Sequence, residues 1–117
     1  AEPAFPAMAP KGVVELSDDE HDRQALLKVH AAEALEAGDN GLALERLTEA
    51  ISLGCASALM YGRRADVLLK LGRPRAAIND CDAALDINPD NAKAYKIRAR
   101  AQRRLKRWAE AHADFTT

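Results

Sequence analysis

Residues 58–89 read ALMYGRRADVLLKLGRPRAAINDCDAALDINP, and their pattern recurs once before and once after in the chain, with a period of about 34 residues. In this register, small or apolar residues fall into three columns: Ala31, Ala65 and Ala99; Ala43, Ala77 and Ala111; and Leu47, Cys81 and Phe115. The agreement of these columns at one spacing predicts an array of similar copies, of which 58–89 is the middle one.

The positions of the small residues indicate the secondary structure of each copy. An alanine in each half of a copy lets two helices approach closely, so each copy is predicted to be a hairpin of two antiparallel helices. The turns are expected at Gly38-Asp39 and at Gly72-Arg73-Pro74, because glycine takes the left-handed cap conformation and proline fits the first position of a helix. In the third copy Lys106 stands at this place, which is a weaker turn signal.

Apolar residues with a period near 3.6 and cap signals place the helices. Ser17-Asp18-Asp19-Glu20 has the pattern of a capping box, so the first helix is expected to begin there. Its apolar stripe consists of Leu26, Leu27, Ala31, Ala34 and Leu35. The residue before Pro89 is pushed out of helical conformation, which ends the fourth helix. The expected helices cover about 17–37, 41–53, 58–71, 73–87, 91–105 and 107–117, the last one being cut short.

A segment without regular structure is expected before the repeats. Residues 1–16 contain three prolines and no helical or alternating period, so they are predicted to be a disordered linker. The repeat domain then covers 17–117, with copies at about 17–57, 58–91 and 92–117. The predicted fold class is all-α: a solenoid of three helix-turn-helix hairpins with a truncated last copy.

Composition narrows the class of protein. Of the 117 residues 48% are hydrophobic and only 4% are aromatic, which is typical of one helical-repeat domain with a core of Leu, Ile and Ala. No apolar run reaches about 18 residues and the start lacks a signal-peptide pattern, so no membrane partner is expected. The chain begins without Met, and we expect it to be a fragment of a longer protein. Cys55 and Cys81 are expected to be buried thiols of a cytoplasmic protein.

The net charge of −1 conceals a gradient along the chain. Residues 1–57 hold 4 Lys and Arg against 11 Asp and Glu, residues 58–91 hold 5 of each, and residues 92–117 hold 8 against 2. A basic end attracts nucleic acid, an acidic peptide or an acidic protein surface. Nucleic acid is disfavoured, because aromatic residues are few and Tyr61 and Tyr95 are expected to pack between repeats.

No motif for catalysis or metal binding is present. The sequence lacks G-x-S-x-G, a phosphate-binding loop and a Cys-His-Asp set, and its three histidines are too scattered to share a metal. Residues 86–91 open like a calcium loop but hold Asn91 in place of the required glycine. Asp80 and Asp82 are interpreted as polar faces of a helix around a buried Cys81. We therefore expect a protein that is not an enzyme and holds no cofactor or metal.

The period, the hairpin copies and the alanine columns resemble the tetratricopeptide repeat. The large aromatic and proline positions of that family are filled by Tyr61, Tyr95, Trp108 and Pro89. The first copy departs from the pattern, with Leu27 in place of the aromatic and Cys55 in place of the proline. The resemblance covers residues 24–117 and implies a tetratricopeptide-repeat solenoid that binds other proteins.

A narrower resemblance lies in the second and third copies. The patterns KL-x-x-P-x-AAI-x-DCD-x-A-x-x-INPD and W-x-EA-x-x-D are similar to those of the Hip family of co-chaperones and of plant tetratricopeptide-thioredoxins. The resemblance implies a module that binds the nucleotide-binding domain of the seventy-kilodalton heat-shock chaperone, stabilises its ADP-bound state and slows ADP release. It also implies a dimer through a region N-terminal to the repeats, which this chain lacks, so a monomer is expected. A targeting arm of a fused thioredoxin is the alternative within the same resemblance.

Another alternative is a receptor for a chaperone C-terminal EEVD peptide. Such receptors hold the peptide with a carboxylate clamp of two Lys, two Asn and one further Lys or Arg. Lys28 and Lys93 match that pattern, but Ala32, Arg63 and Ile97 occupy the other places. The amides that give the clamp its bidentate geometry are therefore missing.

A broader polar surface on the first helix of each hairpin is favoured over the clamp. A solvated helix exterior explains most charge runs, but eight cations against two acids in the segment 92–117 are more than solubility requires. Contact with an acidic protein surface is therefore predicted. The predicted partner-binding residues are Lys28, Arg63, Asp66, Lys70, Lys93, Lys96, Arg100, Arg103 and Arg104.

Overall fold

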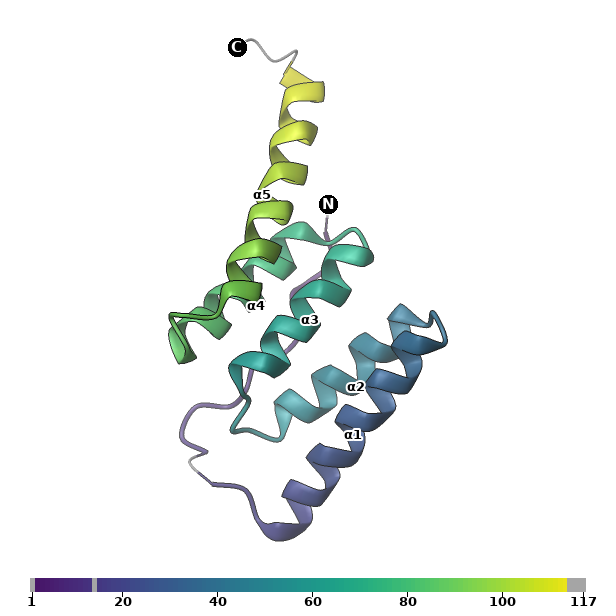
Figure 1. The fold of residues 1–117 in the computed structure, drawn as a ribbon, viewed down its shortest axis with the longest axis vertical. Coiled ribbons are helices and arrows are strands. Elements are labelled where there is room, and N and C mark those ends of the chain that lie inside the picture. The colour runs from purple at the N-terminus through teal and green to yellow at the C-terminus, as the bar shows by residue number, and fades with distance from the viewer. Residues whose placement is uncertain (1, 14, 114–117) are drawn as a thin grey trace.

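Five α-helices in succession form the computed structural model, which describes residues 2–13 and 15–113, with side chains up to Lys106. They are α1 (Asp18–Glu36), α2 (Asn40–Ser52), α3 (Ala58–Lys70), α4 (Pro74–Ile87) and α5 (Ala92–Ala113), as Figure 1 shows. All regular structure in this part of the chain is helical, which confirms the predicted class. Among these helices, none combines the length and apolar content that a membrane crossing requires.

The first two copies are the predicted hairpins. Helix α1 packs on α2 and α3 packs on α4, while α2 joins the two hairpins through α3. Gly38 and Gly72 take positive φ values of 79° and 74° in the turns, and Pro74 is the first residue of α4. The turn chemistry inferred from the sequence is thus confirmed in both copies.

Side-chain caps fix where the helices begin. Ser17 accepts from the backbone N–H of Glu20 at 3.2 Å, and Glu20 Oε1 accepts from the backbone N–H of Ser17 at 3.0 Å. This is the predicted capping box, and its hydrogen bonds lower the pKa of Glu20. Asp39 and Ser57 cap α2 and α3 in the same way with one side-chain bond each.

The alanine columns mark the packing of the first two copies. Their members there are at most 2% exposed: Ala31, Ala43, Leu47, Ala65, Ala77 and Cys81. The third copy differs, because Ala99 is exposed and α5 buries a stripe of Ala94, Ile97 and Ala101 against its neighbours. The predicted burial of Ala99 is therefore wrong.

A single helix replaces the third hairpin over the described residues. Helix α5 runs from Ala92 to Ala113 without a break at Lys106, where a turn was predicted. The sequence there holds neither a glycine to take the left-handed cap nor a proline to start a new helix, and its Arg, Lys, Gln and Leu residues favour continued helix. The predicted side-chain packing of Trp108, Ala111 and Phe115 lies outside the described residues.

The N-terminal segment, residues 2–9, is irregular as predicted but is not free. Figure 1 shows its purple trace passing behind α3, and its backbone bonds to side chains of the second hairpin. Further along, Leu16 is only 5% exposed. The expectation of a disordered linker is therefore wrong for this segment, because polar side chains of the hairpin satisfy a backbone that cannot pair with itself.

Two predicted core residues lie at the surface. Cys55 is exposed, because it lies in the turn between hairpins with φ at 51° and not on a packed helix. Leu26 is 55% exposed, because neighbours on a helix point about 100° apart and only Leu27 of this pair faces the core. Both predictions of burial are thus corrected.

Candidate functional site

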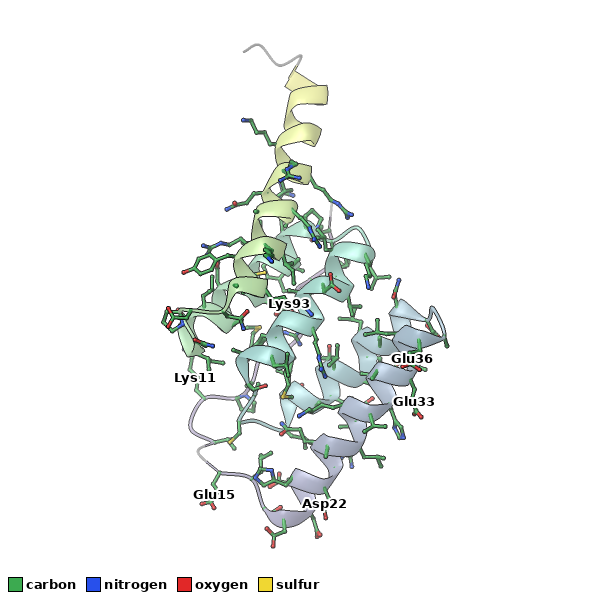
Figure 2. All side chains as sticks on the ribbon, in the orientation of Figure 1. Lys11, Glu15, Asp22, Glu33, Glu36 and Lys93 are labelled. Atoms are coloured by element: carbon green, nitrogen blue, oxygen red, sulfur yellow. The ribbon has the colours of Figure 1, made fainter. Side chains whose placement is uncertain are left out.

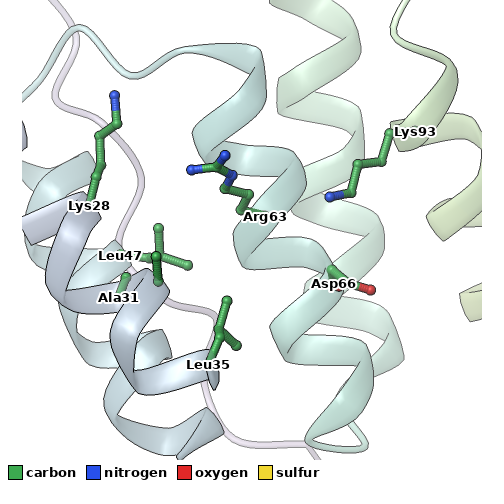
Figure 3. A pocket seen from close by; sticks show the side chains of 8 residues that line it. Lys28, Ala31, Leu35, Leu47, Arg63, Asp66 and Lys93 are labelled. Carbon is green, nitrogen blue, oxygen red and sulfur yellow. The ribbon is translucent and has the colours of Figure 1, made fainter. Parts of the chain in front are cut away.

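The first helices of the three copies line a pocket. Lys28, Ala31, Ala32 and Leu35 of α1, Leu47 of α2, Arg63 and Asp66 of α3, and Lys93 of α5 surround about 250 Å³, here called the inner pocket. Figure 3 shows Arg63 reaching from α3 toward α1 and Lys93 reaching from α5 toward α3. The volume is small for a cofactor and suits one or two side chains of a bound partner.

Cations dominate the charged groups of the inner pocket. Among the described side chains, no carboxylate lies within 4.0 Å of Lys28, Arg63 or Lys93. Asp66 is paired instead with Lys70, at 3.5 Å between Nζ and Oδ2. Apolar side chains form part of the walls, and within the described residues the three cations have no carboxylate partner. The pocket can therefore receive a carboxylate with an aliphatic stem.

The structure brings four of the predicted partner-binding residues together: Lys28, Arg63, Asp66 and Lys93. Lys70 borders them through its pair with Asp66. Of the remaining four, Lys96, Arg100 and Arg103 are exposed on α5 but do not line the pocket.

Arg104 has a structural contact that sequence alone does not indicate. Its Nη1 donates to the backbone carbonyl of Leu69, in the last turn of α3. That carbonyl also accepts from the backbone N–H of Gly72 at 3.1 Å, so Arg104 adds a second donor at the end of α3. Arg104 therefore caps α3 from α5, and this donor is not available to a partner.

The carboxylate clamp is incomplete in three dimensions as well as in sequence. Ala32 lines the inner pocket where an amide is needed, and Ile97 is 2% exposed within the core. Lys28 and Lys93 are the two clamp residues that remain in place. A carboxylate would thus meet cations here without the amide donors that fix its orientation.

Opposite charges lie at the two ends of the repeat array. Figure 2 shows Asp22, Glu33 and Glu36 on α1, whereas Lys93 stands on α5 at the other side of the inner pocket. The charge gradient along the sequence is therefore also a gradient in space. An acidic partner surface is attracted toward α3 and α5.

A buried ion pair on another side of α3 escaped the sequence interpretation. Arg64 is 0% and Asp80 is 1% exposed, and Arg64 Nε and Nη2 donate to Asp80 Oδ2 and Oδ1 at 2.7 and 2.8 Å. Burial raises the pKa of Asp80, although Arg64 acts in the opposite direction. Asp80 therefore lies in the buried part of α4, which corrects its interpretation as part of a polar helix face.

A signal for this pair exists in the sequence. Arg98 and Asp114 follow Arg64 and Asp80 by one repeat period. A charged pair that recurs in register indicates a structural role, and in the second hairpin it is the buried pair of Arg64 and Asp80. Asp82, by contrast, is exposed and pairs with Arg98 at 2.9 Å, as a polar helix face predicts.

Comparison with known proteins identifies the repeat. The family model described as tetratricopeptide repeat matches residues 63–116. The chain is 45% identical over 109 residues to the 58 kDa phosphoprotein of Plasmodium berghei, covering 93% of this chain and 26% of that protein. It is 43% identical over 100 residues to the TPR repeat-containing thioredoxin TDX of Arabidopsis thaliana, covering 86% of this chain and 26% of that protein.

A third relative is Hsc70-interacting protein 1 of Drosophila melanogaster. It is 38% identical over 89 residues, which cover 76% of this chain and 24% of that protein. The chain thus spans about a quarter of the length of the curated relatives it matches.

Solved structures share the fold. The Arabidopsis OM64 TPR domain has a TM-score of 0.72 and 34% identity, with 82% of this chain and 79% of that chain covered. The second TPR domain of human RPAP3, in complex with the HSP70 peptide SGPTIEEVD, has a TM-score of 0.70 and 28% identity, with 82% and 80% covered. With its two helical hairpins, alanine columns and these matches, the chain belongs to the tetratricopeptide-repeat family.

Proposed function

We propose that this domain is a co-chaperone adaptor that binds the nucleotide-binding domain of the seventy-kilodalton heat-shock chaperone. By holding the ADP-bound state it slows ADP release, and it acts as a binding module without catalysis of its own. The observation that carries this proposal is the set of three uncompensated cations, Lys28, Arg63 and Lys93, around the inner pocket. Similarity to Hsc70-interacting protein supports the choice of partner.

An acidic domain surface fits the inner pocket better than a peptide terminus does. Arg63 stands where a clamp has asparagine, and its long cationic side chain reaches across the space between α3 and α1 (Figure 3). A guanidinium offers five N–H donors and can bind a carboxylate with two of them, so Arg63 can pair with an acidic side chain of a partner surface. Lys96 and Arg100, exposed further along α5, extend the same basic face.

The test is a titration of the whole chain against the ADP-bound chaperone with and without its C-terminal tail. Binding should persist without the tail and weaken as salt increases, because exposed charges are screened. Lys93→Glu combined with Arg100→Glu should weaken it at least tenfold. Lys11→Glu combined with Arg75→Glu, the same change of charge outside the inner pocket, is the matched control. Loss of binding on tail deletion would exclude this function.

A second candidate is a receptor for an EEVD peptide. It is favoured by Lys28 and Lys93, which keep their clamp positions at the inner pocket, and by the peptide-bound RPAP3 domain. Calorimetric titration with a peptide ending in EEVD would show heat that Lys28→Ala abolishes. The absence of heat at micromolar to millimolar peptide would dispose of this candidate.

A targeting arm of a thioredoxin fusion is the third candidate, supported by the similarity to TDX. The sequence of the parent gene downstream of residue 117 decides it. A Trp-Cys-x-x-Cys motif there would establish the fusion, and its absence would exclude it.

A further inference from the structure

Residues 2–9, the N-terminal segment, are bonded to the second hairpin along their length. At one end the Glu2 carboxylate accepts from the backbone N–H groups of Arg75 and Ala76, at 2.9 and 3.2 Å. These belong to the first turn of α4, where N–H groups lack partners within the helix and the dipole favours an anion. Next, Arg73 Nη2 donates to the carbonyl of Ala4 at 2.7 Å. A carboxylate and one carbonyl thus anchor the start of the segment.

The other end of the segment is held by α3. Arg64 Nη1 donates to the carbonyl of Ala7 at 2.7 Å, and the hydroxyl of Tyr61 accepts from the N–H of Ala9 at 3.0 Å. Between them, Met8 Sδ accepts from Arg64 Nη2 at 3.3 Å and from Asn79 Nδ2 at 3.5 Å. We call Tyr61, Arg64, Arg73, Asn79 and the first turn of α4 the outer surface.

The outer surface is built to bind an extended chain. Arg64 is fully buried and its guanidinium is held by both oxygens of Asp80, so the donor to the Ala7 carbonyl is fixed in place. Preorganised donors reduce the entropy lost on binding. Three of the seven hydrogen bonds go to the backbone of the segment, at Ala4, Ala7 and Ala9. The other four go to two side chains only, the Glu2 carboxylate and Met8 Sδ. This is a pattern of peptide recognition and not of core packing.

The segment does not use every donor that the outer surface offers. Arg73 Nε is buried and has no hydrogen-bond partner among the described residues. An unpaired buried donor costs free energy. A peptide with an acceptor side chain near the position of Ala4 can satisfy this donor. Other extended peptides can therefore compete with residues 2–9.

We propose that the outer surface is a second peptide-binding site, separate from the inner pocket and occupied in cis by residues 2–9. Its ligand is an extended partner peptide of the pattern E-x-x-x-x-A-M-A, with the acid at the first turn of α4 and small residues over α3. The proposal does not depend on the chaperone function. It gives the domain two binding faces with different ligands.

The experiment uses the full chain. Glu2→Arg together with Ala9→Pro removes the carboxylate and the donor of the resident segment while leaving every residue of the outer surface unchanged. A fluorescein-labelled peptide of residues 1–13 is then titrated and followed by anisotropy. The released variant should bind it at least tenfold more tightly than the parent chain, in which the tethered segment competes at about millimolar effective concentration. Equal binding to both chains, or binding to neither, would overturn the proposal.

Two controls sharpen the result. The labelled peptide with Glu2→Gln should bind the released variant at least threefold more weakly, and an unlabelled EEVD peptide should not displace the probe. Displacement by that peptide would place the probe in the inner pocket and refute a second site.

Circular dichroism checks that the released variant stays helical. Should it unfold, the parent chain offers another measurement. Tyr61→Phe removes the acceptor of the Ala9 N–H, so exchange of that amide hydrogen should accelerate at least tenfold. Unchanged exchange would overturn the proposal just as directly.

Discussion

Arg63 and Arg64 are neighbours in the sequence with opposite environments. Arg63 is exposed and lines the inner pocket, whereas Arg64 is 0% exposed and bonds Asp80 and the N-terminal segment. Successive residues on a helix differ by about 100° in direction, so α3 presents one arginine to a partner and the other to its own hairpin. The number of cations in a segment therefore does not show which of them can bind a partner and which stabilise the fold.

The largest effect is expected on the unfolding free energy, from a change at the buried side of α3. Arg64→Ala leaves the Asp80 carboxylate buried without its partner, which costs about 3–5 kcal/mol of unfolding free energy. Urea denaturation measures it. Arg63→Ala is the matched control and should stay within about 0.5 kcal/mol of the parent. Equal losses in the two variants would contradict the contrast between the two sides of α3.

The next effect concerns binding at the exposed side. Arg63→Glu should weaken the association with the nucleotide-binding domain at least tenfold, about 1.4 kcal/mol, because it places an acid among the cations of the inner pocket. Arg75→Glu makes the same charge change on α4 outside the pocket, and its binding should stay within twofold of the parent. Isothermal titration at low and high salt compares the two variants. Equal weakening would mean that net charge and not the pocket controls the association.

A smaller effect separates Tyr61 from Tyr95, which stands one repeat period later in the sequence. Each lies beside an arginine, with Arg64 Cζ at 5.7 Å from the ring of Tyr61 and Arg98 Cζ at 5.2 Å from that of Tyr95. Tyr61 is 5% exposed and its hydroxyl bonds Ala9, whereas Tyr95 is 47% exposed, which corrects the packing role predicted for it. Within the described residues the hydroxyl of Tyr95 has no hydrogen bond like the one between Tyr61 and Ala9.

Removal of each hydroxyl tests this difference. Tyr61→Phe should lower the unfolding free energy by about 0.5–1.5 kcal/mol, the net value of one hydrogen bond, and Tyr95→Phe should leave it unchanged. Thermal or urea denaturation gives both values. A larger loss for Tyr95→Phe would reverse the comparison.

The last prediction concerns the chemical reactivity of the two cysteine thiols, and it changes no residue of the protein. Cys81 is 0% exposed, and burial raises its pKa to about 12, so it stays a neutral thiol at pH 8. Cys55 is exposed beside the carbonyl of Val13, with Sγ at 3.6 Å from the oxygen. Iodoacetamide at pH 8 should modify one thiol in the folded chain and both in denaturant, as mass spectrometry can count. Two modified thiols in the folded chain would show that the hairpin opens.

Local sequence signals predicted the fold of the first two copies well. The capping box at Ser17, the glycines at 38 and 72 and the proline at 74 act within a few residues of themselves, so their effect can be read without tertiary structure. The missing turn of the third copy agrees with this rule, because Lys106 carries no such signal.

The candidate site was predictable in part. Helical spacing and family positions indicated Lys28, Arg63, Asp66 and Lys93, which the structure brings to one pocket. Spacing could not show that Arg104 caps α3, because that contact joins residues 35 positions apart.

The sequence by itself determined an all-helical repeat, the turns and alanine contacts of its first two copies and the basic character of its inner face, because these follow from period, caps and charge. Only the tertiary structure decided that residues 2–9 bind the second hairpin, and that Arg64 is buried while Arg63 is free. The physical reason is the distance along the chain between the residues that are in contact. A contact between Ala7 and Arg64 spans 57 positions and leaves no local pattern, since backbone carbonyls are the same in every residue.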